Sequence, residues 1–305
     1  MAGYLLRRIP RVIVVVWGAV TVIFLLQRLS GDPVHLMLPD TASQDQLDAV
    51  RADLGLDKPV LVQYLLFIGR FARLDFGQSY LQHRPVADIV FERLPYTLEL
   101  AGAAVLIATV GGTLLGAFAA RMRRRWPDKA VVGGALIGQS VPTFWLGIVA
   151  ILVFSVTLRW FPSSGSGGLS NLVLPAVTLG AFSLANTTRI ARASMIESLS
   201  AEYTQTAHAK GLGTMRVVGV HALKNSGISI LTLTAYTFST LMGGALVTEV
   251  VFAWPGVGRL MVDGVLKRDF PVVQGAVFVV ALIVVVTYLL LDLAYTFLDP
   301  RLRRS

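Results

Sequence analysis

The side chains that could perform chemistry form no known catalytic or metal-binding motif in this sequence. The chain has no cysteine, which excludes disulfides, thiolate nucleophiles and thiolate metal sites. Its four histidines, His35, His83, His208 and His221, never stand three or four residues apart, the spacing that places two metal ligands on one face of a helix. We therefore expect no metal site built by this chain alone.

Motifs that bind phosphate or activate a serine are missing as well. A P-loop needs Gly-Lys followed by Ser or Thr, because backbone amides hold the phosphates while the lysine neutralises them. The sequence contains no Gly-Lys dipeptide and no Gly-x-Ser-x-Gly nucleophile elbow. These absences predict that the chain is not an enzyme and holds no cofactor of its own.

The elements that would have to position any functional group are long and apolar. Hydrophobic residues make up 54% of the 305 residues and charged residues only 15%, a composition typical of a membrane protein. A helix needs about 20 apolar residues to cross a hydrocarbon core of about 30 Å. Six stretches meet or approach this length and predict an all-α polytopic membrane protein: Ile9–Leu29, Leu98–Ala120, Ala130–Leu158, Leu172–Thr188, Ile228–Thr248 and Val272–Leu291. The fourth stretch is short and contains Pro175, so it could instead be re-entrant.

The distribution of basic residues orients these six spans. An even number of crossings places both termini on one side, and the loops on that side contain sixteen of the 27 Lys and Arg residues against five acids. The other loops contain eleven basic and thirteen acidic residues. The positive-inside rule then predicts that both termini are cytoplasmic. The net charge of +9 follows from this orientation, which removes the argument for a nucleic-acid partner.

Two loops are long enough to carry structure outside the membrane. The extracytoplasmic segment 30–96 contains two amphipathic helix candidates, Ser43–Leu54 and Leu61–Leu74, and is either a cap over the spans or a docking surface. The cytoplasmic segment 189–226 contains a short predicted helix that ends at Gly211. This segment could dock on a partner or lie on the lipid headgroups as a connector.

The spans themselves carry small and weakly polar side chains. Charged residues stand at span ends, and Glu249 is expected there as a capping or snorkelling residue, with a proton relay as the alternative. An ion-coupled carrier needs a charge well inside a span. Gly112 and Gly116 form a Gly-x-x-x-Gly pair typical of close helix packing. Pro142 is expected to break a helix beside a water-filled path. The candidates for pore lining or gating are Gln139, Ser140, Pro142, Thr143, Ser239, Thr240, Gly243, Gly244 and Glu249.

Several motifs resemble the permeases of binding-protein-dependent ABC importers in the dipeptide, oligopeptide and nickel group. The strongest is Glu202-Tyr203-x-x-Thr206-Ala207-x-Ala209-Lys210-Gly211-Leu212, which is similar to the cytoplasmic signature loop of that family. Asp75-Phe76-Gly77-x-Ser79, Glu249-x-x-Phe252-x-Trp254-Pro255-Gly256-x-Gly258 and Leu298-Asp299-Pro300-Arg301 match other parts of its first permease subunit. The matches run in order along nearly the whole chain.

The resemblance implies a type I ABC importer permease fold in a single transmembrane domain, residues 1–305, of the bacterial inner membrane. It implies four kinds of partner: a homologous second permease subunit, two ATP-binding subunits that hold ATP and Mg²⁺, an extracytoplasmic solute-binding protein, and the membrane. The coupling residues toward the ATPase would be Glu202, Tyr203, Thr206, Ala207, Ala209, Lys210, Gly211 and Leu212. The docking candidates toward the binding protein are Trp254, Pro255, Gly256, Asp75 and Gly77.

The turn from Glu249 to Gly258 has two readings. It is expected to act as a gate or binding-protein contact, with an interfacial anchor formed by Phe252 and Trp254 as the alternative.

The cargo is expected to be a di- or oligopeptide, with nickel or a metal chelate as the alternative in the same family. An autonomous secondary transporter or channel is the alternative from another class, and it would move solute without any ATPase.

Overall fold

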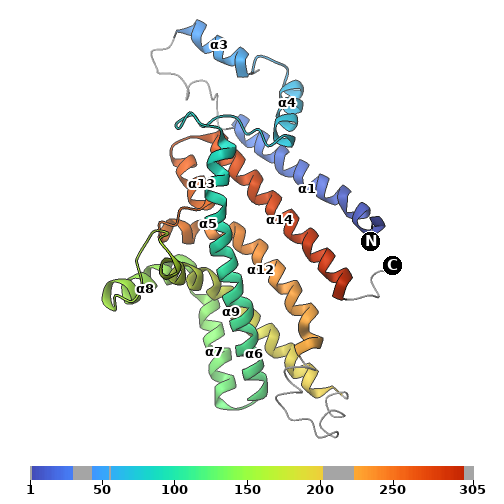
Figure 1. The fold of residues 1–305 in the computed structure, drawn as a ribbon, viewed down its shortest axis with the longest axis vertical. Helices are drawn as coiled ribbons and strands as arrows, with labels where there is room; N and C mark the ends of the chain where they lie inside the picture. The colour runs from blue at the N-terminus through green and yellow to red at the C-terminus, as the bar shows by residue number, and fades with distance from the viewer. Residues whose placement is uncertain (1, 30–42, 55, 202–222, 299–305) are drawn as a thin grey trace. The chain divides into compact units, whose positions relative to one another are not determined.

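The computed structural model describes residues 2–29, 43–54, 56–201 and 223–298. Regular structure in these ranges is helical, apart from an isolated antiparallel bridge between Gln78 and Pro85. The predicted all-α class is therefore confirmed for this part of the chain (Figure 1). In chain order the elements are α1 (Ala2–Leu29), α3 (Gln44–Leu54), α4 (Val60–Ala72), α5 (Val86–Leu106), η1 (Ile107–Gly111), α6 (Gly112–Arg121), α7 (Trp126–Ser140), α8 (Thr143–Ala150), η2 (Ile151–Thr157), α9 (Leu169–Ser200), α12 (Leu223–Val251), α13 (Val257–Leu266) and α14 (Phe270–Leu298).

Three helical segments among the described residues are long and apolar enough to cross a membrane: Val86–Arg121, Leu169–Ser200 and Phe270–Leu291. A fourth candidate is the pair Trp126–Ser140 and Thr143–Thr157, whose two halves are bent by 104°. The apolar stretch Ala130–Leu158 is therefore not one continuous helix, and the break expected at Pro142 lies inside it. Pro142 explains the break, since proline offers no N–H to a helical ladder and forces the preceding residue out of the helical region. Val141 accordingly has φ −85° and ψ 126°.

The re-entrant alternative for the fourth predicted span is also wrong. Leu169–Ser200 is one continuous helix of 32 residues that contains Pro175 in its second turn. Helix α9 thus extends well past Thr188, and the predicted cytoplasmic loop from Arg189 begins with helical residues. Arg189 and Asn186 lower the local hydropathy, which is why the apolar stretch in the sequence looks shorter than the helix.

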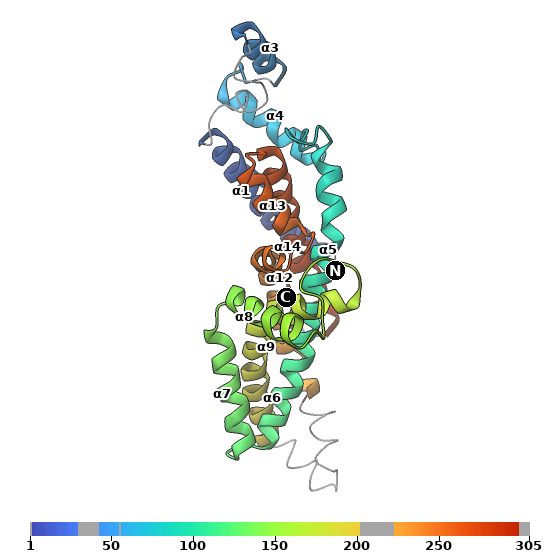
Figure 2. The ribbon, with the colours of Figure 1, turned by 90° about the vertical axis from the view of Figure 1, so that its left-hand side faces the viewer.

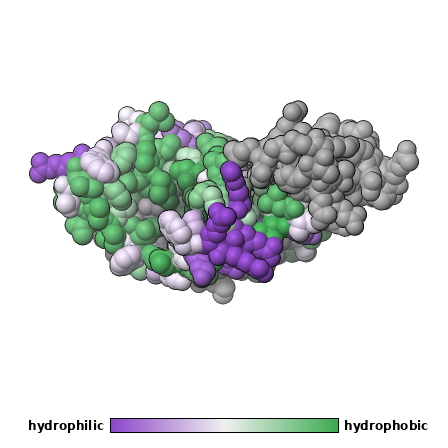
Figure 3. Space-filling view, turned by 90° about the horizontal axis from the view of Figure 1, so that it is seen from below, coloured by the Kyte–Doolittle hydropathy of each residue, from purple (hydrophilic) through white to green (hydrophobic). Residues whose placement is uncertain are grey.

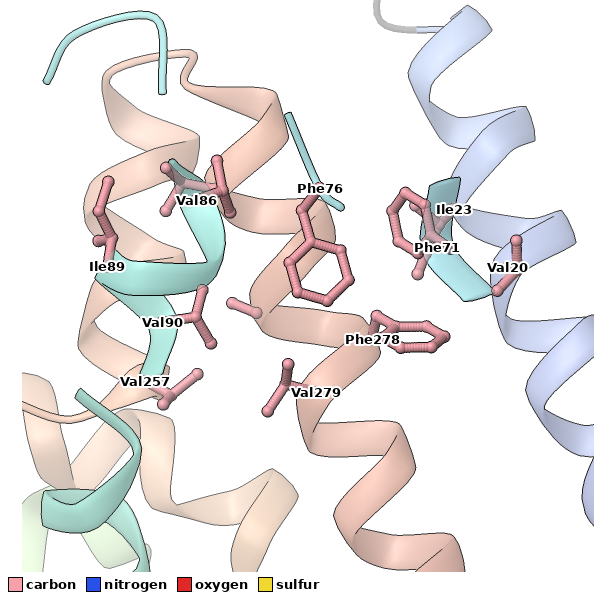
Figure 4. Packing of buried hydrophobic residues seen from close by; sticks show 12 residues of the cluster. Val20, Ile23, Phe71, Phe76, Val86, Ile89, Val90, Val257, Phe278 and Val279 are labelled. Atoms are coloured by element: carbon pink, nitrogen blue, oxygen red, sulfur yellow. The ribbon is translucent and has the colours of Figure 1, made fainter. Parts of the chain in front are cut away.

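The chain divides into two compact units, Met1–Pro95 with Gly256–Val286, and Tyr96–Pro255 with Thr287–Ser305. The core of the first unit combines side chains from α1, α4, the start of α5 and α14 (Figure 4). Phe71 packs against two other aromatic rings of this core, with its ring centroid 5.2 Å from those of both Phe76 and Phe278. Val86 and Val90 of α5 are fully buried in the same cluster. The predicted amphipathic helices of the outer module, α3 and α4, begin and end within two residues of their predicted bounds.

A capping box begins α3. The backbone N–H of Gln46 donates to Ser43 Oγ at 3.4 Å, and the backbone N–H of Ser43 donates to Gln46 Oε1 at 2.9 Å. This reciprocal pair satisfies amides that the first turn of a helix leaves free. The Ser-x-x-Gln spacing therefore fixes where this helix starts.

In the second unit α9 is the central helix. Helices α6, α7, α8 and α12 all pack against it, and Figures 1 and 2 show α6, α7 and α9 side by side. The rest of α5 continues through the wide turn of η1 into α6. The candidate pathway residues lie on α7, α8 and α12 or, for Pro142, between α7 and α8, so α9 connects the elements that carry them.

Candidate functional site

Helices α6 and α9 approach each other closely enough that only glycine fits at the contact. A Cβ on Gly116 would lie 2.7 Å from the carbonyl oxygen of Thr188 and 2.8 Å from the backbone nitrogen of Arg192. A Cβ on Gly112 would lie 2.7 Å from Cβ of Thr187. All three distances are shorter than a real Cβ contact allows, so the predicted role of this glycine pair in helix packing is confirmed.

A buried ion pair joins the turn between α6 and α7 to α9. Arg192 donates from Nε and Nη2 to Asp128 Oδ1 and Oδ2 at 2.5 and 2.8 Å. The backbone N–H of Arg124 donates to Asp128 Oδ2 at 3.0 Å, and Asp128 is only 4% exposed. We call Asp128 and Arg192 the α7–α9 clamp.

Sequence reasoning did not single out the α7–α9 clamp. Two signals in the sequence could have identified it. Asp128 is an acid in a run of basic residues, and it lies in the first turn of α7 behind Pro127, where a negative charge interacts favourably with the helix dipole.

The turn between α6 and α7 exposes a cluster of positive charge. Its exposed side chains are Arg121, Arg123, Arg124, Arg125 and Lys129. Viewed from this end, hydrophilic side chains gather in one patch over the turn (Figure 3). Such a cluster is typical of the cytoplasmic end of membrane helices.

The break between α7 and α8 brings four pathway candidates together. Gln139 and Ser140 end α7, Pro142 is the N-cap of α8, and Thr143 is its first residue. The predicted break at Pro142 is confirmed, and Ser140 and Pro142 are exposed. Arg189 of α9 joins them, because its Nη1 donates to Gln139 Oε1 at 2.7 Å.

Helix α12 divides its candidates between two faces. Thr240, Gly243 and Gly244 are exposed, and a Cβ on either glycine would meet no atom within 4 Å. Ser239 is 8% exposed, and its Oγ has no hydrogen-bond partner among the described residues. The face of α12 that carries Thr240, Gly243 and Gly244 is therefore not covered by other described residues, whereas Ser239 lies on the buried face of the helix.

Glu249 lies two residues before the end of α12 and is completely buried. Thr97 Oγ1 of α5 donates to its Oε1 at 2.7 Å. The expectation of a snorkelling side chain is therefore wrong, because an acid held by a hydroxyl inside the helix bundle has no path to the surface. Glu249 instead joins the end of α12 to the middle of α5.

The turn after α12 is packed inward. Trp254 and Phe252 are each 1% exposed, and Trp254 Nε1 donates to the carbonyl oxygen of Tyr96 at 2.9 Å. Phe252 lies against Gly147 of α8, where a Cβ would be 3.1 Å from its ring. An interfacial anchor would expose both rings, so that alternative is wrong. Pro255 is half-buried, so part of its ring is accessible to a partner, unlike the side chain of Trp254.

The docking candidates of the first unit lie in a tight loop before α5. Asp75 is exposed, and its Oδ1 accepts the backbone N–H of Gly77 at 3.0 Å. Gly77 has φ +78°, a conformation that favours glycine. Gly256 is buried as the N-cap of α13, so it shapes the backbone rather than presenting a side chain.

Asp269 holds this loop from the turn between α13 and α14. Ser79 Oγ donates to Asp269 Oδ2, and the backbone N–H of Tyr80 donates to Oδ1 at 3.1 Å. Burial, and then the nearby charge of Asp269, raise the pKa of Tyr80 to about 12. Sequence reasoning missed Asp269, because its partners are nearly 190 residues away along the chain.

The predicted ATPase-coupling residues lie outside the described residues. They are Glu202, Tyr203, Thr206, Ala207, Ala209, Lys210, Gly211 and Leu212. Helix α9 ends at Ser200, directly before them.

The chain is similar to known transport proteins over its whole length. It is 40% identical over 312 residues to a putative peptide transport system permease protein of Brucella abortus, covering 99% of each chain. It is 38% identical over 304 residues to a glutathione transport system permease protein of Escherichia coli, again covering 99% of each.

A solved structure also shares its fold. The methionine ABC transporter MetNI, in inward-facing conformations, matches with a TM-score of 0.59 and 17% identity, covering 69% of this chain and 96% of that one. Residues 1–101 match the N-terminal family of binding-protein-dependent transport system membrane components. Residues 112–304 match the inner membrane component itself. The chain therefore belongs to the family of binding-protein-dependent transport system inner membrane components.

Proposed function

We propose that this chain is the first permease subunit of an ABC importer that takes up di- and oligopeptides delivered by a solute-binding protein. The cargo assignment rests on the similarity, over 99% of the chain, to permeases named for peptide and glutathione transport. Both named solutes contain peptide bonds and carboxylates, so we assign the same chemical class to this chain.

The chain itself is a multi-pass permease of the inner membrane and performs no catalysis. Its family implies an ATPase and a solute-binding protein as partners. We further propose one homologous permease subunit beside it and two ATP-binding subunits on the cytoplasmic side.

We propose six crossings with both termini in the cytoplasm. The three long helices would supply three of them, and the broken pair, taken as one span, would supply the fourth. Helices α1 and α12, of 28 and 29 residues, are each long enough for another at about 1.5 Å per residue. The exposed arginines of the turn between α6 and α7 support the assignment of that end to the cytoplasm.

Movement would enter the chain through residues 202–212. The coupling segment directly follows α9, so closure of the ATPase subunits would displace the end of α9. The glycine contacts of α6 and the α7–α9 clamp connect α9 to both neighbouring helices. We therefore propose that α6, α7 and α9 move as one body when ATP binds.

The solute path would run past the break between α7 and α8 and the open face of α12. Gln139, Ser140, Thr143 and Thr240 offer amide and hydroxyl groups without net charge, which bind a passing solute weakly. These neutral groups would add little to the affinity for the solute, so they would not slow its release.

Uptake by the complete complex in proteoliposomes tests this assignment. The measurement compares a tripeptide, glutathione and a nickel chelate, each supplied on the purified binding protein with ATP at the ATPase subunits. We expect accumulation of the tripeptide. Accumulation of the nickel chelate alone would reject the peptide assignment and leave the ATP-driven mechanism standing.

A further inference from the structure

Arg189 is a charged side chain for which packing and coupling give no role. It is exposed on α9, and its Nη1 donates to the neutral Gln139 Oε1 at 2.7 Å. In the ranges that the structure describes, no carboxylate forms an ion pair with it. Its positive charge is therefore oriented by an amide and left without compensation by the surrounding described residues.

The guanidinium of Arg189 extends away from the basic turn. Asp128 and Gln139 are about 16 Å apart along α7 at about 1.5 Å per residue, whereas Arg189 and Arg192 are only about 4.5 Å apart along α9. Arg192 contacts Asp128 and Arg189 contacts Gln139, so the two side chains extend in opposite directions. This direction is the ordinary one for Arg189, because helical side chains lean toward the N-terminus of their helix.

At this depth the neighbouring surface is apolar. On α7, Leu136 and Ile137 are 51% and 67% exposed, directly beside Gln139. Closer to the basic turn, Phe118 and Trp126 are also exposed, so the apolar surface continues past the level of Arg189. A charged group within a membrane segment faces the bundle interior or a water-filled cavity rather than lipid. The side of the second unit that carries Arg189 and Gln139 is therefore one that water reaches.

We propose that Arg189 binds a carboxylate of the solute as the solute passes the break between α7 and α8. This inference rests on the proposed peptide-importer function. A peptide carries a C-terminal carboxylate that loses hydration in a narrow pathway, and a guanidinium can replace that hydration with charge-assisted hydrogen bonds. Gln139 uses one of the five N–H donors of Arg189 and orients the planar group. The remaining donors are sufficient for a carboxylate.

The test measures whether Arg189 discriminates between an anionic and a neutral solute. The complete complex is reconstituted with Arg189→Gln, Arg189→Lys or the unchanged chain, and uptake of a tripeptide is compared with uptake of its C-terminal amide. The preference of the binding protein is common to all variants, so the change in the ratio of the two rates belongs to the permease. Arg159→Gln is the control, since Arg159 is an exposed arginine beyond η2.

Arg189→Gln removes one charge-assisted hydrogen bond to the carboxylate, so we expect it to slow uptake of the free acid about tenfold. Uptake of the amide should slow less than about twofold, because the amide carries no carboxylate at that position. Arg189→Lys is expected to keep most of the free-acid rate, and Arg159→Gln to keep both rates. Equal loss for both solutes would overturn the proposal and identify Arg189 as a contact to the second permease subunit. Unchanged uptake of both would overturn it as well.

Two further outcomes remain decisive. If no variant takes up the amide, the free acid alone decides. Uptake of the free acid that survives in Arg189→Lys but is lost in Arg189→Gln, with assembly and ATPase activity unchanged, supports the proposal. An equal loss in both variants refutes it. If the unchanged complex imports neither peptide, the peptide-importer function fails first, and the carboxylate proposal fails with it.

Discussion

The α7–α9 clamp offers the sharpest prediction about how movement reaches the pathway. Asp128→Asn keeps the size and one acceptor of the side chain but removes its charge. Asp128 accepts three hydrogen bonds, two from Arg192 and one from the backbone of Arg124. Because Arg192 keeps 27% of its side chain exposed and can regain water, we expect a loss of about 1–3 kcal/mol rather than the larger cost of a fully buried unpaired charge.

Hydrogen exchange measures this loss locally. The amide of Arg124 is protected by Asp128, so its exchange should accelerate about 5- to 150-fold in Asp128→Asn, following about 1.4 kcal/mol per tenfold change. The number of solute molecules imported per ATP hydrolysed should fall in the same variant, because α7 no longer follows α9. Glu197→Gln is the matched control, since Glu197 is an exposed acid on α9.

A double-mutant cycle separates the pair from its surroundings. Arg192→Gln alone should resemble Asp128→Asn, and the double variant should cost less than the two single changes added together, with a coupling energy of about 1 kcal/mol or more. If exchange at Arg124 and the transport-to-ATPase ratio both match those of the unchanged chain, the α7–α9 clamp has no role in transmitting movement, and the reasoning is refuted.

Three more outcomes follow from the structure. Gly116→Val should destabilise the complex by about 1–3 kcal/mol through overpacking at Thr188. Gly133→Val, with no atom within 4 Å of its Cβ, should be neutral or slightly stabilising, because valine is a better helix former than glycine. Thermal unfolding of both variants measures this difference, and equal destabilisation would contradict the packing. Tyr80, with its pKa raised to about 12, should remain protonated when ordinary tyrosines ionise near pH 10. The contribution of protonated Tyr80 to the stability of the fold is present below pH 10 and lost as the pH rises to 12. In an absorbance titration of the tyrosines, the step at the highest pH should disappear in Tyr80→Phe. Single cysteines at the exposed positions Arg124 and Asp48 should react with membrane-impermeant reagents from opposite sides, and labelling from the same side would refute the six-span topology.

Local sequence rules predicted the features that depend on neighbouring residues. The helix predicted over Ser43–Leu54 is α3, and Pro142 breaks the helix where its missing N–H requires. The Gly112 and Gly116 pair packs against α9 as its spacing predicts. These features were predictable because each results from backbone geometry within a few residues.

The features that the sequence did not reveal depend on contacts between distant segments. Asp269 binds Ser79 and Tyr80, and Glu249 binds Thr97, across more than 150 residues. Hydropathy alone treats Arg189 as the end of a span, because it scores the charge and not the direction of the side chain. Trp254 was expected to face a partner, but its buried position depends on the carbonyl of Tyr96, a contact that no local pattern indicates.

The dependence of uptake on the ATPase subunits tests the central claim most directly. The measurement compares peptide accumulation in proteoliposomes that contain both permease subunits with and without the ATPase subunits, at saturating ATP and loaded binding protein. The permease assignment predicts uphill accumulation only with the ATPase subunits, and predicts its loss in Gly211→Val at unchanged complex assembly. Uphill accumulation by the permease subunits alone would contradict the account and identify an autonomous carrier.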